Sequence, residues 1–300
     1  MTTISVLLHE NDERFFTTPY LARLLVREWR HLGFAVEVRR GTEKAGLADL
    51  LVPHLDMTVT PDQYRDFIDR HPQALNRGVF DVSKSRISRN LRTRGDRYAG
   101  PVIVKTDRNF GGIPEVLLGR RRGRRGLLPR LAAAIVPRLP RRLGRRIGWR
   151  HVAYLPPDRY PVFSSLPDVP AAVFDNPHLV VEKFLPESHR GGYCVRYHYF
   201  LGDREVNLLV GSASPLVKAE AATYVEEIAS VPPELRALRR ALAMDYGKFD
   251  YVVRDERVVL FDVNRTPAAA LLEKFALSDA AVRELAPGIL SLRARPSGAG

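Results

Sequence analysis

The sequence predicts a protein of mixed α/β and α+β class, in which a small lobe with parallel strands precedes a larger region of hairpins and helices. Two observations support this prediction. Within residues 4–52, apolar segments that suit strands flank an amphipathic helical segment, which is the strand–helix–strand order of a parallel sheet. Further along the chain, two pairs of apolar runs are each joined by a short polar turn, which is typical of antiparallel hairpins.

The composition is that of a globular protein. Of 300 residues, 45% are hydrophobic and 27% are charged, so the chain can bury a sizeable core and is not largely disordered. A single cysteine, Cys194, excludes an internal disulfide and is expected to be a buried strand residue. The N-terminal segment lacks the basic region of a secretory signal, and no apolar run approaches the roughly 18–20 residues needed to cross a bilayer. A cytoplasmic protein is therefore expected.

The N-terminal elements follow from the spacing of apolar residues. Residues 4–8 form a short apolar strand candidate, and residues 20–29 carry apolar side chains at the three- and four-residue spacing of a helix. Residues 34–38 alternate as a strand, 49–52 form a further apolar run, and Pro61 begins a short helix through Asp69. These segments contain no GxGxxG motif, so a dinucleotide site in this lobe has no support.

The later elements are less regular. Residues 102–104 and 179–187 are apolar runs that suit strands, and the two hairpins turn at Gly202-Asp203 and at Asp255-Glu256. Helices are expected over 223–228, 233–244 and 268–285.

The second hairpin carries the strongest chemical pattern. Asp250 precedes its first strand, and Asp262 and Asn264 lie two residues apart near the end of the second. Side chains two apart on a strand share a face, so the three oxygen donors are expected to converge. Carboxylate and amide oxygens suit a hard cation such as Mg²⁺. An acid inside the apolar run VVLFDVN is costly unless it is paired or metal-bound, which favours the metal site over a hairpin with solvated polar ends.

Two further segments suit a nucleotide. Lys105 ends an apolar strand, and Gly111 and Gly112 close the loop after it, so a cation and backbone N–H groups could bind phosphate. In LVVEKFLPE, the backbone of Lys183 to Leu185 could bind an adenine edge, and Glu187 could bind ribose hydroxyls. Taken singly, each segment is better explained as an ordinary surface loop or strand end.

In this order, the three blocks resemble the ATP-grasp superfamily, in particular carboxylate–amine ligases of the glutathione synthetase and glutamate ligase type. The resemblance rests on Lys105 with its glycine loop, on Asp250 with Asp262 and Asn264, and on the hinge tetrapeptide between them. That hinge consists of Glu182, Lys183, Phe184 and Leu185. The resemblance implies a Rossmann-like pre-grasp lobe and two further lobes that clamp the nucleotide.

The resemblance also implies roles for three more residues. Lys84 matches an earlier nucleotide-contacting lysine, and Arg196 resembles the arginine of a D-x-R element whose acid is replaced here by Cys194. Lys248 stands two residues before the first metal ligand, where an arginine often steadies the transferred phosphate. Arg196 and Lys248 are thus the expected catalytic residues, with ATP and Mg²⁺, or Mn²⁺ in its place, as cofactors.

The net charge of +13 comes from one segment. Residues 116–157 contain twelve arginines and neither lysine nor acid, and the rest of the chain carries 35 basic and 34 acidic residues, so DNA is not an expected partner. Arginines interleaved with leucines and followed by Trp149 favour two short amphipathic pieces on an anionic membrane surface, which would make the protein peripheral at the inner membrane surface. An acidic partner such as RNA at residues 120–150, or a solvated loop, are the alternatives.

The expected domains are a pre-grasp domain over 1–80, an ATP-grasp domain over 81–290 with an insertion at about 116–157, and a flexible tail over 291–300. The expected activity is that of an ATP-dependent ligase, which activates a carboxylate as an acyl phosphate and couples it to an amine or similar nucleophile. A kinase acting on a hydroxyl group and a non-catalytic nucleotide-binding scaffold are the alternatives. The sequence leaves the carboxylate and the nucleophile open.

Overall fold

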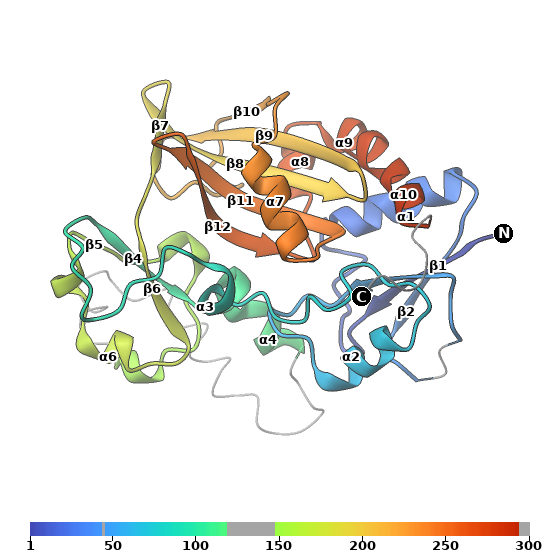
Figure 1. Cartoon of the computed structure of the whole chain (residues 1–300), viewed down its shortest axis with the longest axis horizontal. Coiled ribbons are helices and arrows are strands. Elements are labelled where there is room, and N and C mark those ends of the chain that lie inside the picture. Colours follow the sequence, from blue (N-terminus) through green and yellow to red (C-terminus); the bar gives the residue numbers. More distant parts are fainter. Residues whose placement is uncertain (44–45, 119–147, 294–300) are drawn as a thin grey trace. The chain divides into compact units, whose positions relative to one another are not determined.

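A computed structural model describes residues 1–43, 46–118 and 148–293 (Figure 1). The chain forms two compact units. The large unit consists of Met1–Asp81 and Pro186–Gly300, and the small unit consists of Val82–Leu185. The large unit thus joins the N-terminal segment to the C-terminal third of the chain. In the described part of the chain, no helix is long and apolar enough to cross a membrane.

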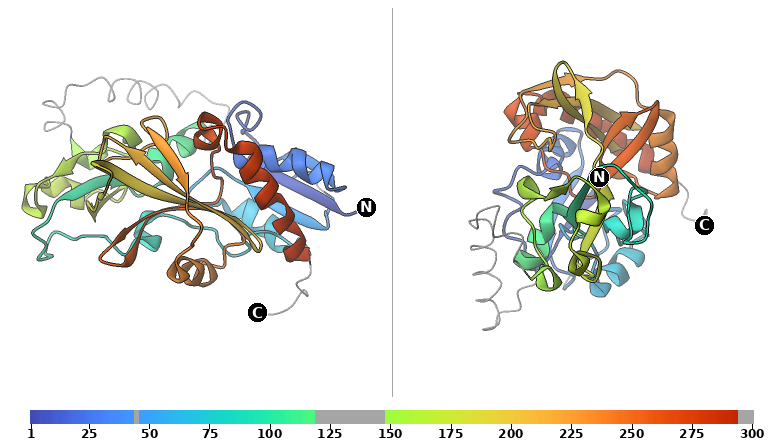
Figure 2. Two further views of the ribbon diagram at one scale, coloured as in Figure 1. Left: turned by 90° about the horizontal axis from the view of Figure 1, so that it is seen from above. Right: turned by 90° about the vertical axis from the view of Figure 1, so that its left-hand side faces the viewer.

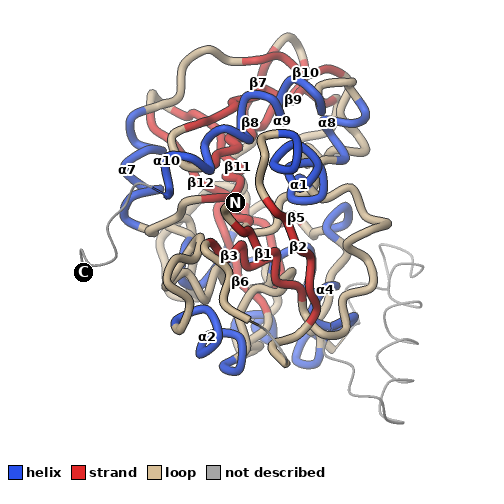
Figure 3. Tube along the Cα trace, turned by 90° about the vertical axis from the view of Figure 1, so that its right-hand side faces the viewer, coloured by secondary structure: helices blue, strands red, loops and turns tan. Residues whose placement is uncertain are grey.

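A parallel three-stranded sheet opens the large unit, in the order β2-β1-β3 (Figure 3). Its strands are β1 (Thr3–Leu8), β2 (Ala35–Arg40) and β3 (Leu50–His54). The intervening helix α1 (Leu21–His31) buries the apolar face that its sequence spacing predicts, and α2 (Asp62–Asp69) follows β3. The expected β-α-β opening is confirmed.

An antiparallel sheet forms the second part of the large unit, in the order β10-β9-β8-β11-β12, with β7 paired to β8. Both expected hairpins are present and turn where the sequence predicts. The strands are β7 (Glu187–His189), β8 (Gly192–Leu201), β9 (Arg204–Ser212), β10 (Tyr224–Glu227), β11 (Tyr246–Arg254) and β12 (Arg257–Asn264).

The two faces of this sheet have different coverings. Tyr197 and Tyr199 of β8 belong to the same buried core as α1 and the C-terminal helices, which lie beside α1 in Figures 1 and 2. The alternate residues His198 and Phe200 point to the other face, because successive side chains of a strand alternate. The C-terminal helices are α8 (Ala270–Lys274), α9 (Ser278–Leu285), the 3-10 turn η7 (Ala286–Gly288) and α10 (Ile289–Arg293).

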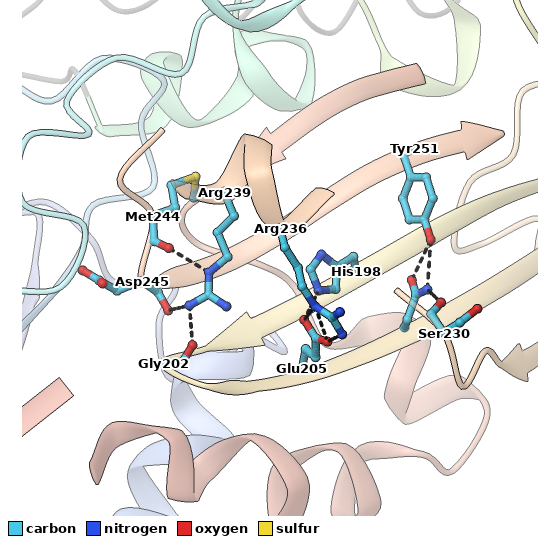
Figure 4. A network of polar contacts seen from close by, with 10 residues as sticks. His198, Gly202, Glu205, Ser230, Arg236, Arg239, Met244, Asp245 and Tyr251 are labelled. Carbon is cyan, nitrogen blue, oxygen red and sulfur yellow. Dashed lines mark hydrogen bonds and ion pairs between the residues drawn. The ribbon is translucent and has the colours of Figure 1, made fainter. Parts of the chain in front are cut away.

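Helix α7 (Pro233–Ala241) contributes two arginines to the His198 face (Figure 4). Arg236 forms a hydrogen-bonded ion pair with Glu205, whose Oε2 also lies 3.2 Å from His198 Nε2. Arg239 stacks over the Phe200 ring and donates to the carbonyls of residues 202, 244 and 245. These contacts fasten α7 to the sheet.

The small unit is built on an antiparallel sheet with the order β5-β4-β6. Its strands are β4 (Val102–Thr106), β5 (Val162–Phe163) and β6 (Leu179–Lys183). Its helices are α3 (Lys84–Ile87), α4 (Ile113–Leu118) and α6 (Ala171–Phe174), with 3-10 turns η1 (Asn109–Gly112), η4 (Trp149–His151), η5 (Pro157–Arg159) and η6 (Leu166–Asp168).

Three local predictions were wrong. Residues 224–227 form strand β10 rather than a helix, because they pair with β9 and complete the sheet edge. The expected helix over 268–285 is divided into α8 and α9, because Ala276 adopts a positive φ of 55°. Asp250 lies inside β11 rather than before it, since pairing with β8 begins at Tyr246.

Most of the arginine-rich segment 116–157 lies outside the described residues, but residues 148–157 at its C-terminal end are described. Trp149 is only 8% exposed, and its carbonyl accepts a 2.6 Å hydrogen bond from Asn176 Nδ2. The expectation that Trp149 contacts a membrane was therefore wrong, because the indole is already buried in the small unit.

Candidate functional site

The two predicted acidic metal ligands face each other across the β11–β12 hairpin of the large unit. Asp250 and Asp262 are register partners, and Asn264 is the partner of Lys248. An irregularity in the pairing follows directly after Asp250. Because residues two apart on a strand share a face, all four side chains lie on one side of the sheet. The Asn264 Nδ2 atom is 3.5 Å from Asp262 Oδ2.

Lys248 is held against this acidic pair. Its Nζ atom lies 2.7 Å from Asp250 Oδ1 and 3.8 Å from the ring centroid of Tyr197. Burial lowers the pKa of Lys248, but Asp250, Tyr197 and Tyr199 together more than offset this, so its pKa lies above its ordinary value. Burial raises the pKa of Asp250, and Asp262 acts in the same direction, whereas Lys248 opposes both. The raised pKa favours the charged form of Lys248, which lies against Asp250.

This donor set fits a divalent cation. Within the described ranges, no group of three or more His, Cys, Asp or Glu side chains gathers at one point, so the site offers two carboxylates and an amide. Mg²⁺ commonly binds one or two protein carboxylates together with substrate phosphates and water. The two carboxylates, Asp250 and Asp262, would supply the negative charge that binds such a cation.

Gly247 is a residue of this site that the sequence analysis did not identify. A Cβ atom at Gly247 would lie 2.5 Å from the carbonyl oxygen of Asn264, closer than real Cβ contacts allow. Glycine thus lets the backbones of β11 and β12 approach at the level of the predicted metal ligands. The available signal was a glycine inside an apolar strand, which often marks a close backbone approach.

In the small unit, Lys105 and Glu182 form a buried ion pair on neighbouring strands β4 and β6. The Lys105 Nζ atom lies 2.6 Å from Glu182 Oε2, and the Glu182 side chain is 1% exposed. The pair joins the predicted phosphate-binding lysine to the first residue of the predicted hinge. A cation that is held in place by a carboxylate and remains 14% exposed can bind an anion without reorganising.

Lys84 is buried in the same unit and holds the start of the glycine loop. Its Nζ donates to the carbonyl of Arg108 and to Asn109 Oδ1, both at 3.2 Å. Lys84 therefore fixes the segment that leads from β4 into Gly111 and Gly112.

The two loop glycines have a structural requirement that the sequence did not reveal. Gly111 and Gly112 adopt φ values of 69° and 82°. A Cβ at Gly111 would lie 2.1 Å from the Leu155 carbonyl oxygen, and one at Gly112 would lie 3.2 Å from the Ala153 carbonyl oxygen. In this structure the glycines make room for the segment 153–155.

The hinge tetrapeptide ends where the small unit ends. The Lys183 N–H donates to the Asn90 carbonyl and the Phe184 N–H to the Pro101 carbonyl, each at 2.9 Å. The Leu185 N–H has no such acceptor among the described residues. Of the three N–H groups considered for an adenine edge, two are thus used within the unit, and the Leu185 N–H remains the candidate donor.

Glu187 and Arg196 form an ion pair in the large unit. Glu187 Oε2 accepts hydrogen bonds from Arg196 Nη1 and, at 2.8 Å, from the Val253 N–H. Arg196 also lies over the ring of Tyr251. Cys194 is buried as predicted, and burial raises the pKa of its thiol to about 12. The two residues predicted to bind ribose and to act in catalysis therefore support each other.

Comparison with known proteins identifies the fold. No family model and no curated protein sequence match the chain. Among solved structures, the chain is similar to a D-alanine–D-alanine ligase from Bacillus anthracis, with a TM-score of 0.51, 13% identity and coverage of 99% of this chain and 97% of that one. It is also similar to a Chryseobacterium gregarium RiPP-associated ATP-grasp ligase in complex with ADP and a leader and core peptide, with a TM-score of 0.51, 9% identity and coverage of 100% and 99%. The chain has the ATP-grasp fold, as the sequence resemblance predicted.

Proposed function

We propose that the chain is an ATP-dependent ligase that joins a carboxylate to an amine or a similar nucleophile. The observation that carries this proposal is the pairing of Asp250 with Asp262 beside Lys248 and Asn264, in a chain with the ATP-grasp fold. Both similar structures described above are ligases by name, which supports the same reaction class.

The small unit would bind ATP. Lys105, fixed by Glu182, would contact the phosphates, and Lys84 would support the loop beside them. The Leu185 N–H would donate to the adenine edge. Glu187 of the large unit would accept from the ribose hydroxyls.

The large unit would hold the metal. Asp250, Asp262 and Asn264 would bind Mg²⁺, or Mn²⁺ in its place, and the bound cation would neutralise charge on the ATP phosphates. Lys248, whose pKa lies above its ordinary value, would stabilise negative charge on the transferred phosphoryl group.

The proposed reaction has two balanced steps. A carboxylate oxygen of the substrate attacks the γ-phosphorus of ATP, and the bond to the β-phosphate oxygen breaks to give an acyl phosphate and ADP. The amine nitrogen then attacks the acyl carbon, loses a proton and expels inorganic phosphate. Arg196, oriented by Glu187, would bind the oxygen that becomes negative in the second step.

A product assay tests the proposal. The full-length chain is incubated with ATP, Mg²⁺ and a panel of carboxylates, amines and hydroxyl compounds, and ADP, free phosphate and organic products are quantified. ADP and phosphate in equal amounts with a coupled product are expected. A stable product that is phosphorylated on a hydroxyl group would show that the protein is a kinase rather than a ligase. Lack of turnover with every substrate, despite ATP binding, would favour a scaffold.

A matched variant links the turnover to the site. Asp262→Asn keeps the size of the side chain and removes one negative charge, so turnover should collapse while the melting temperature changes little. Normal turnover of Asp262→Asn at saturating Mg²⁺ would show that the metal ligands are misassigned.

We also propose that residues 120–147 bind an anionic membrane surface, because this stretch carries eleven arginines and no acid. Co-sedimentation with anionic and neutral vesicles tests this, with a variant that lacks 120–147 but keeps the buried Trp149 as control. Binding to anionic vesicles that weakens with salt and requires the segment is expected. Absence of binding at low salt would refute the proposal, and complete loss at moderate salt would favour an acidic macromolecule.

A further inference from the structure

We infer that the N-terminal lobe, residues 1–81, positions the predicted metal ligands by holding both open ends of the β11–β12 hairpin, with Asn76 at one end and Arg265 at the other. The inference rests on the proposed function for the identity of the metal ligands. It assigns these two buried side chains a positioning role, because neither belongs to the proposed metal-ligand set.

The Asn76 side chain forms hydrogen bonds with the backbone at the start of β11. Its Oδ1 atom accepts hydrogen bonds from the N–H groups of Asp245 at 2.8 Å and Tyr246 at 3.0 Å. Its Nδ2 donates to the Tyr246 carbonyl at 2.8 Å, and its own N–H donates to Asp245 Oδ2 at 3.0 Å. One side chain thus satisfies donors and an acceptor of the backbone that leads, two residues later, to Lys248.

The backbone of Asn76 is shaped for this contact. Its φ is 54°, in the left-handed region that asparagine tolerates better than most residues, and the residue is 6% exposed. A residue held in this conformation with all these hydrogen bonds indicates that the loop is fixed against β11.

Arg265 holds the end of β12. It directly follows Asn264, and its guanidinium donates to Thr60 Oγ1 at 2.6 Å and to the carbonyls of Val79, Met57 and Thr58 at 2.5, 2.7 and 3.2 Å. Arg265 is 8% exposed. The next residue, Thr266, donates to Asp56 Oδ1 at 3.0 Å. Two consecutive side chains therefore tie this strand end to the loop after β3.

The Asn76 and Arg265 contacts, called the two anchors below, lie on either side of the predicted metal ligands along the strands of the hairpin. Lys248 and Asp250 follow the Asn76 contact along β11, while Asp262 and Asn264 precede Arg265 along β12, and Lys248 and Asn264 are register partners. Both anchors bind loops of the N-terminal lobe, at 57–60 and 76–79. Losing either anchor frees one strand end, so the carboxylates and the amide lose their fixed separation. Metal affinity depends strongly on such supporting residues.

Direct Mn²⁺ binding to the full-length chain tests the inference, measured as the loss of free Mn²⁺ signal in electron paramagnetic resonance. The variants are Asn76→Gly, which removes the side chain without backbone strain, and Arg265→Met, with Arg265→Lys as a partial rescue. Asn176→Ala is the control, because Asn176 is a buried asparagine whose Nδ2 donates to the Trp149 and Val152 carbonyls in the small unit. Asp262→Asn changes a proposed metal ligand itself, so it shows how the Mn²⁺ signal responds when the metal site is lost.

The expected result is Mn²⁺ binding about tenfold or more weaker in Asn76→Gly and Arg265→Met, with a smaller loss in Arg265→Lys. Asn176→Ala should lower the melting temperature and leave Mn²⁺ affinity unchanged. If Asp262→Asn loses Mn²⁺ and both anchor variants bind it like the wild type, the positioning role is overturned and the metal site stands. If Asp262→Asn binds Mn²⁺ like the wild type, the proposed metal site fails, and the inference with it.

Discussion

The Lys105–Glu182 pair yields a prediction that separates nucleotide binding from folding. Lys105→Met removes the charge and keeps most of the side chain's length. The structure indicates that this change has two effects, because Lys105 is both the proposed phosphate ligand and the partner of a carboxylate that is 1% exposed.

The size of the folding effect follows from the geometry. With Nζ and Oε2 only 2.6 Å apart, Lys105→Met leaves Glu182 buried and without this cation. Removing one partner of a buried ion pair costs about 3–5 kcal/mol, whereas replacing both by apolar residues is often close to neutral. The double variant Lys105→Met with Glu182→Met should therefore recover most of the stability that the single variant loses.

The assay combines thermal unfolding with calorimetric titration of ATP and adenosine. Lys105→Met should melt at a lower temperature than the wild type, and the double variant close to it. Both variants should bind ATP at least tenfold more weakly, about 1.4 kcal/mol, because both lack the cation. Adenosine carries no phosphate, so the double variant should bind it with unchanged affinity.

Two results would refute this reasoning. Wild-type affinity for ATP in the double variant would show that Lys105 has only a structural role. An unchanged melting temperature in Lys105→Met would show that the pair contributes nothing to stability, in conflict with its burial.

Three more predictions follow from close contacts and from the α7 network. Gly247→Ala should displace the Asn264 carbonyl and lower turnover more than ATP affinity. Steady-state kinetics and calorimetry measure the two quantities, and equal losses of turnover and of ATP affinity would contradict this prediction. Gly111→Ala should destabilise the chain by about 1–3 kcal/mol in urea unfolding, since φ is 69° and the Leu155 carbonyl blocks a Cβ; wild-type stability would argue against that packing. The His198 hydrogen bond holds the pKa of Glu205 at about 2, below its ordinary 4.5, so stability is present above pH 4.5 and is lost as pH falls toward 2. Glu205→Gln should flatten that acid limb in unfolding curves recorded at several pH values, and an unaltered limb would exclude Glu205 as its cause.

Elements that depend only on neighbours in the chain follow the sequence pattern. Apolar residues at helical spacing predicted α1, and Gly202-Asp203 predicted the β8–β9 turn. Residues 224–227 depart from the pattern because pairing with β9 outweighs local preference, and the helix expected over 268–285 is divided because Ala276 adopts a positive φ that no sequence pattern indicates.

The sequence by itself determined the ATP-grasp fold and the order of its chemical groups, since Lys105, the hinge and the Asp262-x-Asn264 pair are close in sequence to the strands that carry them. Tertiary structure alone decided which distant groups meet: Lys105 with Glu182, and Asn76 with Asp245, the last pair 169 positions apart. The physical reason is that a buried charge or amide requires a partner, and strand register and loop packing choose that partner from distant parts of the chain. A local sequence pattern therefore does not predict which distant residue becomes the partner.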